Sequence, residues 1–345
     1  MIRRPPRSTQ SRSSAASDVY KRQYLTVVEW VMFLSLTSLA ISLAVLVWGA
    51  DKFIESSSLL AKKLGLSELT IGLTIVALGT SAPEIFVGIS SVLNGSEALA
   101  MGTIIGSNIS NIALIFGVSC IGISLAPSKT SIIQLIPFVI GAIILGLGLA
   151  DLKITKAESW QFLILFAVFL LITYKWRASD LSEVSNENEI KLSSTMLFFT
   201  LGLFALIGGS NFAVIHAEQI AIMLGVPELI IGLTIIAIGT SLPELAATIS
   251  AITKKKNDMV IGNVIGSNVM NIALVVPIIG FFSDVSFDST IFSRDYLVMT
   301  VATVLFVLVA TTYSSKKINI NFIRFIGCIF VAGYFGYILS LTGLI

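Results

Sequence analysis

One apolar stretch occurs twice in the sequence, each time with a glutamate directly after a proline. Residues 71–84 read IGLTIVALGTSAPE and residues 231–244 read IGLTIIAIGTSLPE, identical at eleven of fourteen positions with an offset of 160. At the same offset, GTIIGSNISNIAL at 102–114 matches GNVIGSNVMNIAL at 262–274 at nine of thirteen positions. An ionisable side chain in an apolar membrane segment is costly and is a functional candidate by default. The pair Glu84 and Glu244 therefore predicts one site built by two related halves of the chain.

The composition places the chain in the membrane. Only 12% of its residues are charged and 55% are hydrophobic, with a mean hydropathy of +0.93, whereas a soluble domain carries about a quarter charged residues. The net charge of +2 gives no reason to expect a nucleic-acid partner. Cys120 and Cys328 both lie in apolar runs, so we expect small buried side chains and no disulfide. His216, the only histidine, is expected to be a polar residue near a helix end.

Ten apolar runs are long enough to cross a bilayer, at roughly 20 residues each. The fold class that they predict is an all-α polytopic membrane protein of ten transmembrane helices. We expect a first five-helix repeat at 24–176, a polar cytoplasmic linker at 177–193 and a second five-helix repeat at 194–345. The predicted spans are 26–49, 66–93, 98–122, 131–150, 158–176, 194–215, 226–253, 259–281, 292–313 and 319–343.

Residues 1–23 differ from the rest of the chain. They carry six basic residues and no apolar run, so they lack the apolar region of a signal peptide. We interpret this segment as a non-native tail and leave it out of the fold prediction.

The two copies of the stretch are predicted to cross the membrane in opposite directions. They lie on spans 2 and 7, and an odd number of crossings separates them, which gives an inverted-topology repeat of the kind found in secondary transporters. Basic loop residues divide thirteen to three between the two sides, and the richer side is cytoplasmic by the positive-inside rule. Both termini are then outside, in a membrane that we expect to be the prokaryotic inner membrane. The thirteen are Lys52, Lys62, Lys63, Lys129, Lys175, Arg177, Lys191, Lys254, Lys255, Lys256, Lys316, Lys317 and Arg324; the three are Lys153, Lys156 and Arg294.

Helical spacing places polar groups of each copy on one face. One stripe of span 2 holds an alanine and three polar side chains, span 7 repeats it, and spans 3 and 8 each add a serine and an asparagine four residues apart. These are oxygen donors, which suit Na⁺ and Ca²⁺ better than metals that prefer thiolate or imidazole. Pro83 and Pro243 lack an N–H and should free carbonyls around Gly79 and Gly239. The stripe residues are Ala77, Thr80, Ser81 and Glu84 with Ala237, Thr240, Ser241 and Glu244; the pairs are Ser107 with Asn111 and Ser267 with Asn271.

Structural roles are the alternative for each of these residues. A hydroxyl in a membrane helix commonly bonds to its own backbone, and an asparagine can join two helices. The Gly-x-x-x-Gly pairs at 102–106 and 262–266 are expected to serve close packing. A protonated glutamate could form an interhelical hydrogen bond, but packing alone would not require the same donors in both inverted halves.

The pairs GTSAPE with GSNISN and GTSLPE with GSNVMN resemble the alpha-1 and alpha-2 repeats of the sodium/calcium exchangers, within the calcium/cation antiporter superfamily. The chain is most similar to the short prokaryotic members over residues 24–345. The resemblance implies antiport by alternating access, with cation sites between helices 2, 3, 7 and 8 and with helices 1 and 6 sliding over the core. It implies that the twelve stripe and pair residues, Ala77 and Ala237 through their carbonyls, are the cation ligands. Asn271 departs from relatives that carry aspartate there.

The resemblance implies a function without enzymatic chemistry or a cofactor, with Na⁺ and Ca²⁺ as substrates and the bilayer as partner. If three Na⁺ exchange for one Ca²⁺, one net charge moves per cycle, worth about 2.3 kcal/mol across 100 mV. Neutral Asn271 favours exchange that is independent of K⁺. The alternatives are an H⁺-coupled or K⁺-dependent antiporter and an ion channel, whereas an intramembrane protease is disfavoured because the repeated serines have no base nearby in the sequence. The sequence predicts nothing about oligomeric state.

Overall fold

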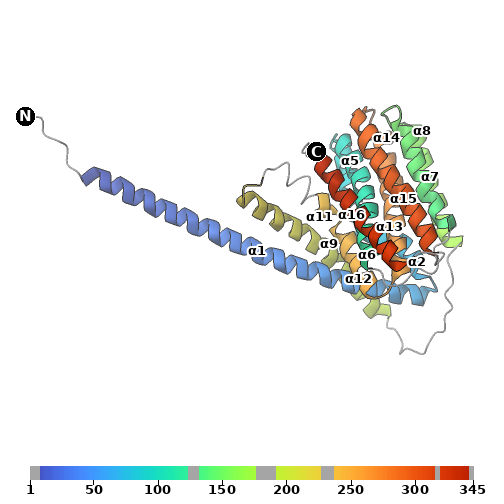
Figure 1. The fold of residues 1–345 in the computed structure, drawn as a ribbon, viewed down its shortest axis with the longest axis horizontal. Helices are drawn as coiled ribbons and strands as arrows, with labels where there is room; N and C mark the ends of the chain where they lie inside the picture. Colours follow the sequence, from blue (N-terminus) through green and yellow to red (C-terminus); the bar gives the residue numbers. More distant parts are fainter. Residues whose placement is uncertain (1–7, 123–131, 176–191, 227–236, 315–318, 342–345) are drawn as a thin grey trace, which may run out of the picture.

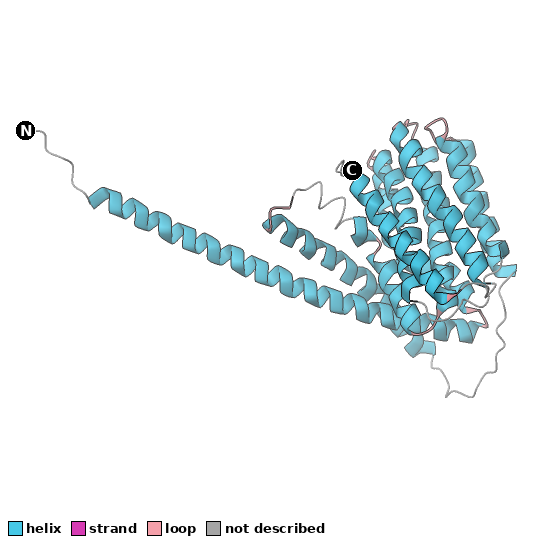
Figure 2. Ribbon diagram, viewed as in Figure 1, coloured by secondary structure: helices cyan, strands magenta, loops and turns pink. Residues whose placement is uncertain are grey.

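The computed structural model describes residues 8–122, 132–175, 192–226, 237–314 and 319–341. Every regular element in these ranges is helical (Figures 1 and 2). The helices form one bundle, and α1 projects from its edge as a single long helix (Figure 1). Part of the predicted linker lies outside the described residues, as do residues 227–236 of the second repeated stretch.

The first half of the chain begins with a helix that is longer than predicted. Helix α1 covers Ser8–Leu64 and ends in a left-handed turn at Gly65, where φ is +63°. The expected span 26–49 was therefore too short, because the apolar run stops at Asp51 while the helix continues. The other elements are α2 (Glu68–Ile71), η1 (Gly72–Val76), α3 (Ala77–Thr80), α4 (Ala82–Leu93), α5 (Glu97–Ile109), η2 (Ser110–Phe116), α6 (Gly117–Gly122), α7 (Ile132–Leu149) and α8 (Lys156–Lys175).

The second half repeats this order at the same offset as the sequence. Both ends of α12 lie 160 residues after those of α4, and both ends of α11 lie 160 residues after those of α3. Gly225 mirrors Gly65 in its left-handed turn, with φ of +74°. The elements are α9 (Leu192–Met223), α11 (Ala237–Thr240), α12 (Leu242–Thr253), α13 (Asn257–Met270), η4 (Asn271–Val275), α14 (Val276–Phe282), η5 (Ile291–Tyr296), α15 (Leu297–Ser314) and α16 (Ile320–Leu341).

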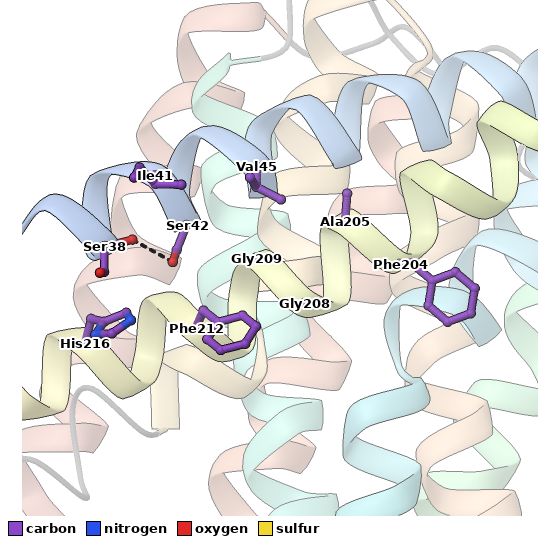
Figure 3. A pocket seen from close by; sticks show the side chains of 10 residues that line it. All are labelled: Ser38, Ile41, Ser42, Val45, Phe204, Ala205, Gly208, Gly209, Phe212 and His216. Atoms are coloured by element: carbon purple, nitrogen blue, oxygen red, sulfur yellow. Dashed lines mark hydrogen bonds between the residues drawn. The ribbon is translucent and has the colours of Figure 1, made fainter. Parts of the chain in front are cut away.

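Helices α1 and α9 pack side by side at one edge of the bundle, at an angle to most of its helices (Figure 1). Glycines make this contact close: a side chain at Gly49 would meet the backbone of Leu206, and one at Gly209 would meet the backbone of Leu46. Gly49 and Gly209 are themselves 160 residues apart, so the contact is made by equivalent positions of the two halves. Farther along the same seam, a cavity of about 420 Å³ lies between the two helices (Figure 3).

Charged side chains join the bundle end of α1 to the core. The Nζ of Lys254, at the end of α12, lies 2.7 Å from Asp51 Oδ1 and 4.0 Å from Glu55 Oε2. Lys256, just before α13, pairs with Glu68 of α2. Three basic residues of the predicted cytoplasmic set take part in these pairs: Lys52 and Lys254 share Glu55, and Lys256 pairs with Glu68. They also explain why α1 continues past the end of its apolar run.

Seven helical stretches of the described residues are long and apolar enough to cross a membrane. An eighth is the bent pair Glu68–Thr80 and Ala82–Leu93, whose two parts meet at 51°. The remaining apolar helices, Ile133–Leu149 and Leu242–Thr253, are shorter. The protein is thus an all-helical membrane protein, and the count of ten crossings stays a prediction.

Candidate functional site

Two interrupted helices supply the centre of the candidate site. Helix α3 ends at Thr80 and α4 starts at Ala82, and Ser81 lies between them with φ −83° and ψ 2°. Ser241 separates α11 from α12 in the same way. The cause lies in the sequence, since Pro83 and Pro243 each lack the N–H that would bond the carbonyl four residues earlier. As predicted from the two prolines, the helices are broken within both repeated stretches, at Ser81 and Ser241.

The carbonyls that the two prolines leave without an intrahelical partner differ in the side chains that can bond to them. Gly239 O accepts a hydrogen bond over 3.2 Å from the hydroxyl of Ser210, which belongs to α9. The position equivalent to Ser210 in the first half is Ala50, which has no hydroxyl to offer to Gly79. Sequence comparison of the two halves shows this Ser/Ala difference, but only the structure shows that the serine reaches the break.

The two glutamates come together in the interior. Glu84 is 3% exposed and Glu244 is 1% exposed, and each lies in the first turn of its helix, α4 or α12, where the helix dipole favours a negative charge. Ser81 of the first half donates a hydrogen bond of 2.9 Å to Glu244 Oε1. Both oxygens of Glu84 and Oε2 of Glu244 have no hydrogen-bond partner among the described residues.

Helices α5 and α13 bring their serine and asparagine pairs to the same buried region. Ser107 and Ser267 are 6% and 0% exposed, and Asn111 and Asn271 are 1% and 2% exposed. The amide groups of both asparagines and the hydroxyl of Ser267 have no partner among the described residues. Both asparagines also lie in wide π-helical turns, η2 and η4, which occur frequently at functional sites.

The threonines and alanines of the stripes differ between the halves. Thr80 is fully buried and donates to Asn263 Oδ1 of α13 over 3.2 Å, with the Ala77 carbonyl 3.4 Å away. Ala77 O also accepts the N–H of Ser81 at 3.0 Å. In the second half the N–H of Ser241 bonds instead to Ile238 O at 3.1 Å, one residue later than the Ala237 carbonyl.

Several residues of this region were not predicted from the sequence. Asn263, the partner of Thr80, and Ser210, the partner of Gly239, both come from helices outside the stretch that they contact. Thr240 is half-buried in α11. The side chain of Ala237 is outside the described part of the chain. The two cavities beside α1 and α9 have mainly apolar walls.

The chemistry of the site is that of hard oxygen donors. A buried polar group without a partner requires an explanation, and among the described residues such groups include oxygens of both carboxylates and the amides of Asn111 and Asn271. The described residues hold no cluster of three or more His, Cys, Asp and Glu side chains. Carboxylate, hydroxyl and amide oxygens, with a charge of −2 when both carboxyl groups are ionised, fit Na⁺ or Ca²⁺ as a substrate and do not suit a thiolate- or imidazole-seeking metal.

Comparisons with known proteins agree with this chemistry. The family described as sodium/calcium exchanger protein matches residues 34–175 and 194–343. The putative antiporter CaxA of Alkalimonas amylolytica is 37% identical over 307 residues, covering 86% of this chain and 95% of that protein. The sodium/calcium exchanger MaX1 of Methanosarcina acetivorans is 29% identical over 325 residues, covering 81% and 92%.

An inner membrane protein, YrbG of Escherichia coli, is 30% identical over 290 residues, covering 80% of this chain and 89% of that protein. Among solved structures, the sodium-calcium exchanger NCX_Mj soaked with Na⁺ and Sr²⁺ superposes with a TM-score of 0.76 at 28% identity, covering 90% of this chain and 99% of that chain. The likeness extends over nearly the whole solved chain.

Proposed function

The chain belongs to the sodium/calcium exchanger protein family. We propose that it exchanges Na⁺ for Ca²⁺ across the membrane by alternating access. The family is one of cation/calcium transporters, and the proposal assigns no enzymatic step to any residue. We place the protein in a prokaryotic inner membrane with both termini outside, in line with the inner-membrane relative and with the distribution of basic residues.

The observation that carries the proposal is the buried pair Glu84 and Glu244, three of whose four oxygens have no partner among the described residues. Each half of the chain contributes one carboxylate, so the site exists only at the interface of the two halves. The proposed ligands are the carboxylates, the neighbouring hydroxyl and amide oxygens, and two carbonyls: Ala77, Thr80, Ser81, Glu84, Ser107, Asn111, Ala237, Thr240, Ser241, Glu244, Ser267 and Asn271.

The charge of the site explains obligatory exchange. One Ca²⁺ or two Na⁺ neutralise the two carboxylates, whereas an empty site holds two unpaired charges in a low dielectric, which is costly. The cation-free protein should therefore resist the change between outward-open and inward-open states. A third Na⁺ would add one positive charge, and the movement of that charge, worth about 2.3 kcal/mol per 100 mV, would make transport electrogenic.

The arrangement of the helices supports alternating access. Ten crossings in two inverted halves would place the two broken helices at the midplane, as in other secondary transporters. Helices α1 and α9 pack closely on each other through Gly49 and Gly209. We expect them to move as a pair relative to the rest of the bundle, opening the site to one side at a time.

Proton coupling is the second candidate, because two neighbouring carboxyl groups can share one proton. A Na⁺ gradient separates the two functions. Purified protein in Na⁺-loaded vesicles should take up ⁴⁵Ca²⁺ when the outside is free of Na⁺, and uptake should stop when Na⁺ is equal on both sides. Uptake driven by a pH gradient but indifferent to Na⁺ would establish the H⁺-coupled alternative.

A further inference from the structure

Asn263 of α13 contacts the candidate site without belonging to the repeated donor set. Its side chain is 2% exposed, and its Oδ1 lies 3.2 Å from the hydroxyl oxygen of Thr80 in the other half of the chain. Thr80 itself is completely buried and lies one turn from Glu84. Asn263 therefore sits directly behind a proposed ligand.

A hydroxyl group has one hydrogen to donate and two lone pairs to offer. When the hydrogen points to Asn263, the lone pairs of Thr80 are directed elsewhere and remain available to a cation. Without this acceptor, the hydroxyl can turn its hydrogen to the Ala77 carbonyl at 3.4 Å, and its lone pairs then turn as well. Groups behind the ligands commonly fix ligand orientation in this way.

We propose that Asn263 is a positioning residue that orients Thr80 as a cation ligand, which rests on the proposed exchange function. The amide acts through Thr80 and does not itself bind the ion. It is held in place by backbone packing: α13 and the first broken helix approach so closely that a side chain at Gly72 or Gly262 would meet the backbone of the other helix. The amide therefore has little freedom to move away from Thr80.

The two halves of the site differ in the residue behind the threonine ligand. The position equivalent to Asn263 is Thr103, whose hydroxyl bonds to the carbonyl of Leu99 in its own helix over 2.9 Å. Thr103 thus differs from Asn263 in side-chain chemistry and in hydrogen-bond partner: it donates within its own helix, whereas Asn263 accepts from the other half of the chain. The inference predicts that Thr80 and Thr240, although identical in sequence context, respond differently to changes in α13 and α5.

A double-mutant cycle tests the inference through ion binding. Equilibrium binding of ⁴⁵Ca²⁺ to the purified full chain, with choline replacing Na⁺, is compared for wild type, Asn263→Leu, Thr80→Val and the double variant. Asn263→Leu should weaken Ca²⁺ binding about 10- to 100-fold in the wild-type background, the usual cost of losing a group that orients a ligand. In the Thr80→Val background the same change should cost no more than about twofold, the limit expected when no coupling remains.

Equal losses in both backgrounds, or no loss in either, would overturn the inference. Thr103→Val is the matched control and should bind Ca²⁺ within about twofold of wild type; a loss as large as that of Asn263→Leu would also overturn it. If the leucine variant does not fold, Asn263→Ala replaces it under the same criteria. Failure of the proposed function is recognised separately, because wild-type ⁴⁵Ca²⁺ would then not be displaced by Na⁺.

Discussion

The hydroxyl of Ser81 donates a hydrogen bond of 2.9 Å to Glu244 Oε1, although 163 residues separate them. Ser81 lies at the break of the first repeated helix and Glu244 in the first turn after the second break. The bond therefore joins the two halves of the chain through two buried side chains. Neither half could form this site alone.

The two carboxylates are the first target for mutation. Glu84→Gln or Glu244→Gln keeps the shape of the side chain and leaves one negative charge where Ca²⁺ needs two. We expect either variant to abolish Na⁺-driven ⁴⁵Ca²⁺ uptake while the protein remains folded. Glu97→Gln, in the first turn of α5, removes a charge outside the site and should transport normally. Near wild-type uptake by either site variant would show that the site is misplaced.

Because the side chain of Asn271 is neutral, we expect exchange that does not need K⁺. Its amide oxygen can coordinate a cation but adds no charge, and its equivalent Asn111 is also neutral. Initial Ca²⁺ uptake should be the same with K⁺ and with an inert organic cation, at a fixed Na⁺ gradient and clamped membrane potential. A several-fold stimulation by K⁺ would contradict this account.

A companion variant, Asn271→Asp, places a titratable group in the cation site. The new carboxyl would lose its proton as pH rises and gain it as pH falls, so uptake should become more sensitive to pH than in the wild type. Uptake is measured across a pH series at a constant Na⁺ gradient. An unchanged pH profile would mean that residue 271 does not face the ions.

Equivalent glycines are predicted to differ in their tolerance of a side chain. A Cβ at Gly262 would meet the backbone of Leu69 and Leu73, whereas a Cβ at the equivalent Gly102 would have no described atom within 4 Å. Gly262→Ala should therefore lower stability by about 1–3 kcal/mol or more, the usual cost of overpacking, and Gly102→Ala should be tolerated. Thermal unfolding of the two purified variants compares them. Equal destabilisation would contradict the close packing of α13 on the first broken helix.

The ion pair of Lys254 with Asp51 should respond to salt. Both side chains are partly exposed, at 26% and 45%, so Lys254→Gln should cost no more than about 1 kcal/mol. The difference from wild type should vanish in about 1 M choline chloride, which screens exposed charges without supplying Na⁺. A loss of stability that is the same at low and high salt would show that Lys254 acts through packing and not through charge.

Much of the candidate site could be predicted because its residues occur in two copies at a fixed offset in the sequence. The duplication identified Glu84 and Glu244, and the two prolines predicted the helix breaks that the structure places at Ser81 and Ser241. The predicted packing role of the Gly-x-x-x-Gly pairs is confirmed for Gly262 and Gly266, which contact the first broken helix, and is wrong for Gly102 and Gly106, where an added Cβ would meet no described atom within 4 Å. These features are local, or are repeated at a fixed offset, and so they can be read from one sequence.

Other features depend on contacts that no local pattern specifies. The bond from Thr80 to Asn263 joins residues 183 apart, and the bond from Ser210 to Gly239 depends on how α9 packs. The length of α1 was underestimated because hydropathy falls at Asp51. Asp51 pairs with Lys254, which lies in a distant part of the chain, and a local hydropathy pattern does not show that pairing. The wide helical turns at Asn111 and Asn271 have no sequence signature that we could use.

If Na⁺ and Ca²⁺ share one site, neither ion can cross without the other. Simultaneous measurement of ²²Na⁺ efflux and ⁴⁵Ca²⁺ influx in the same proteoliposomes tests this coupling. We expect Na⁺ to leave only when Ca²⁺ is present outside, Ca²⁺ to enter only when Na⁺ is present inside, and both fluxes to be lost in Glu84→Gln. Sustained flux of either ion without the other would contradict exchange through a shared site.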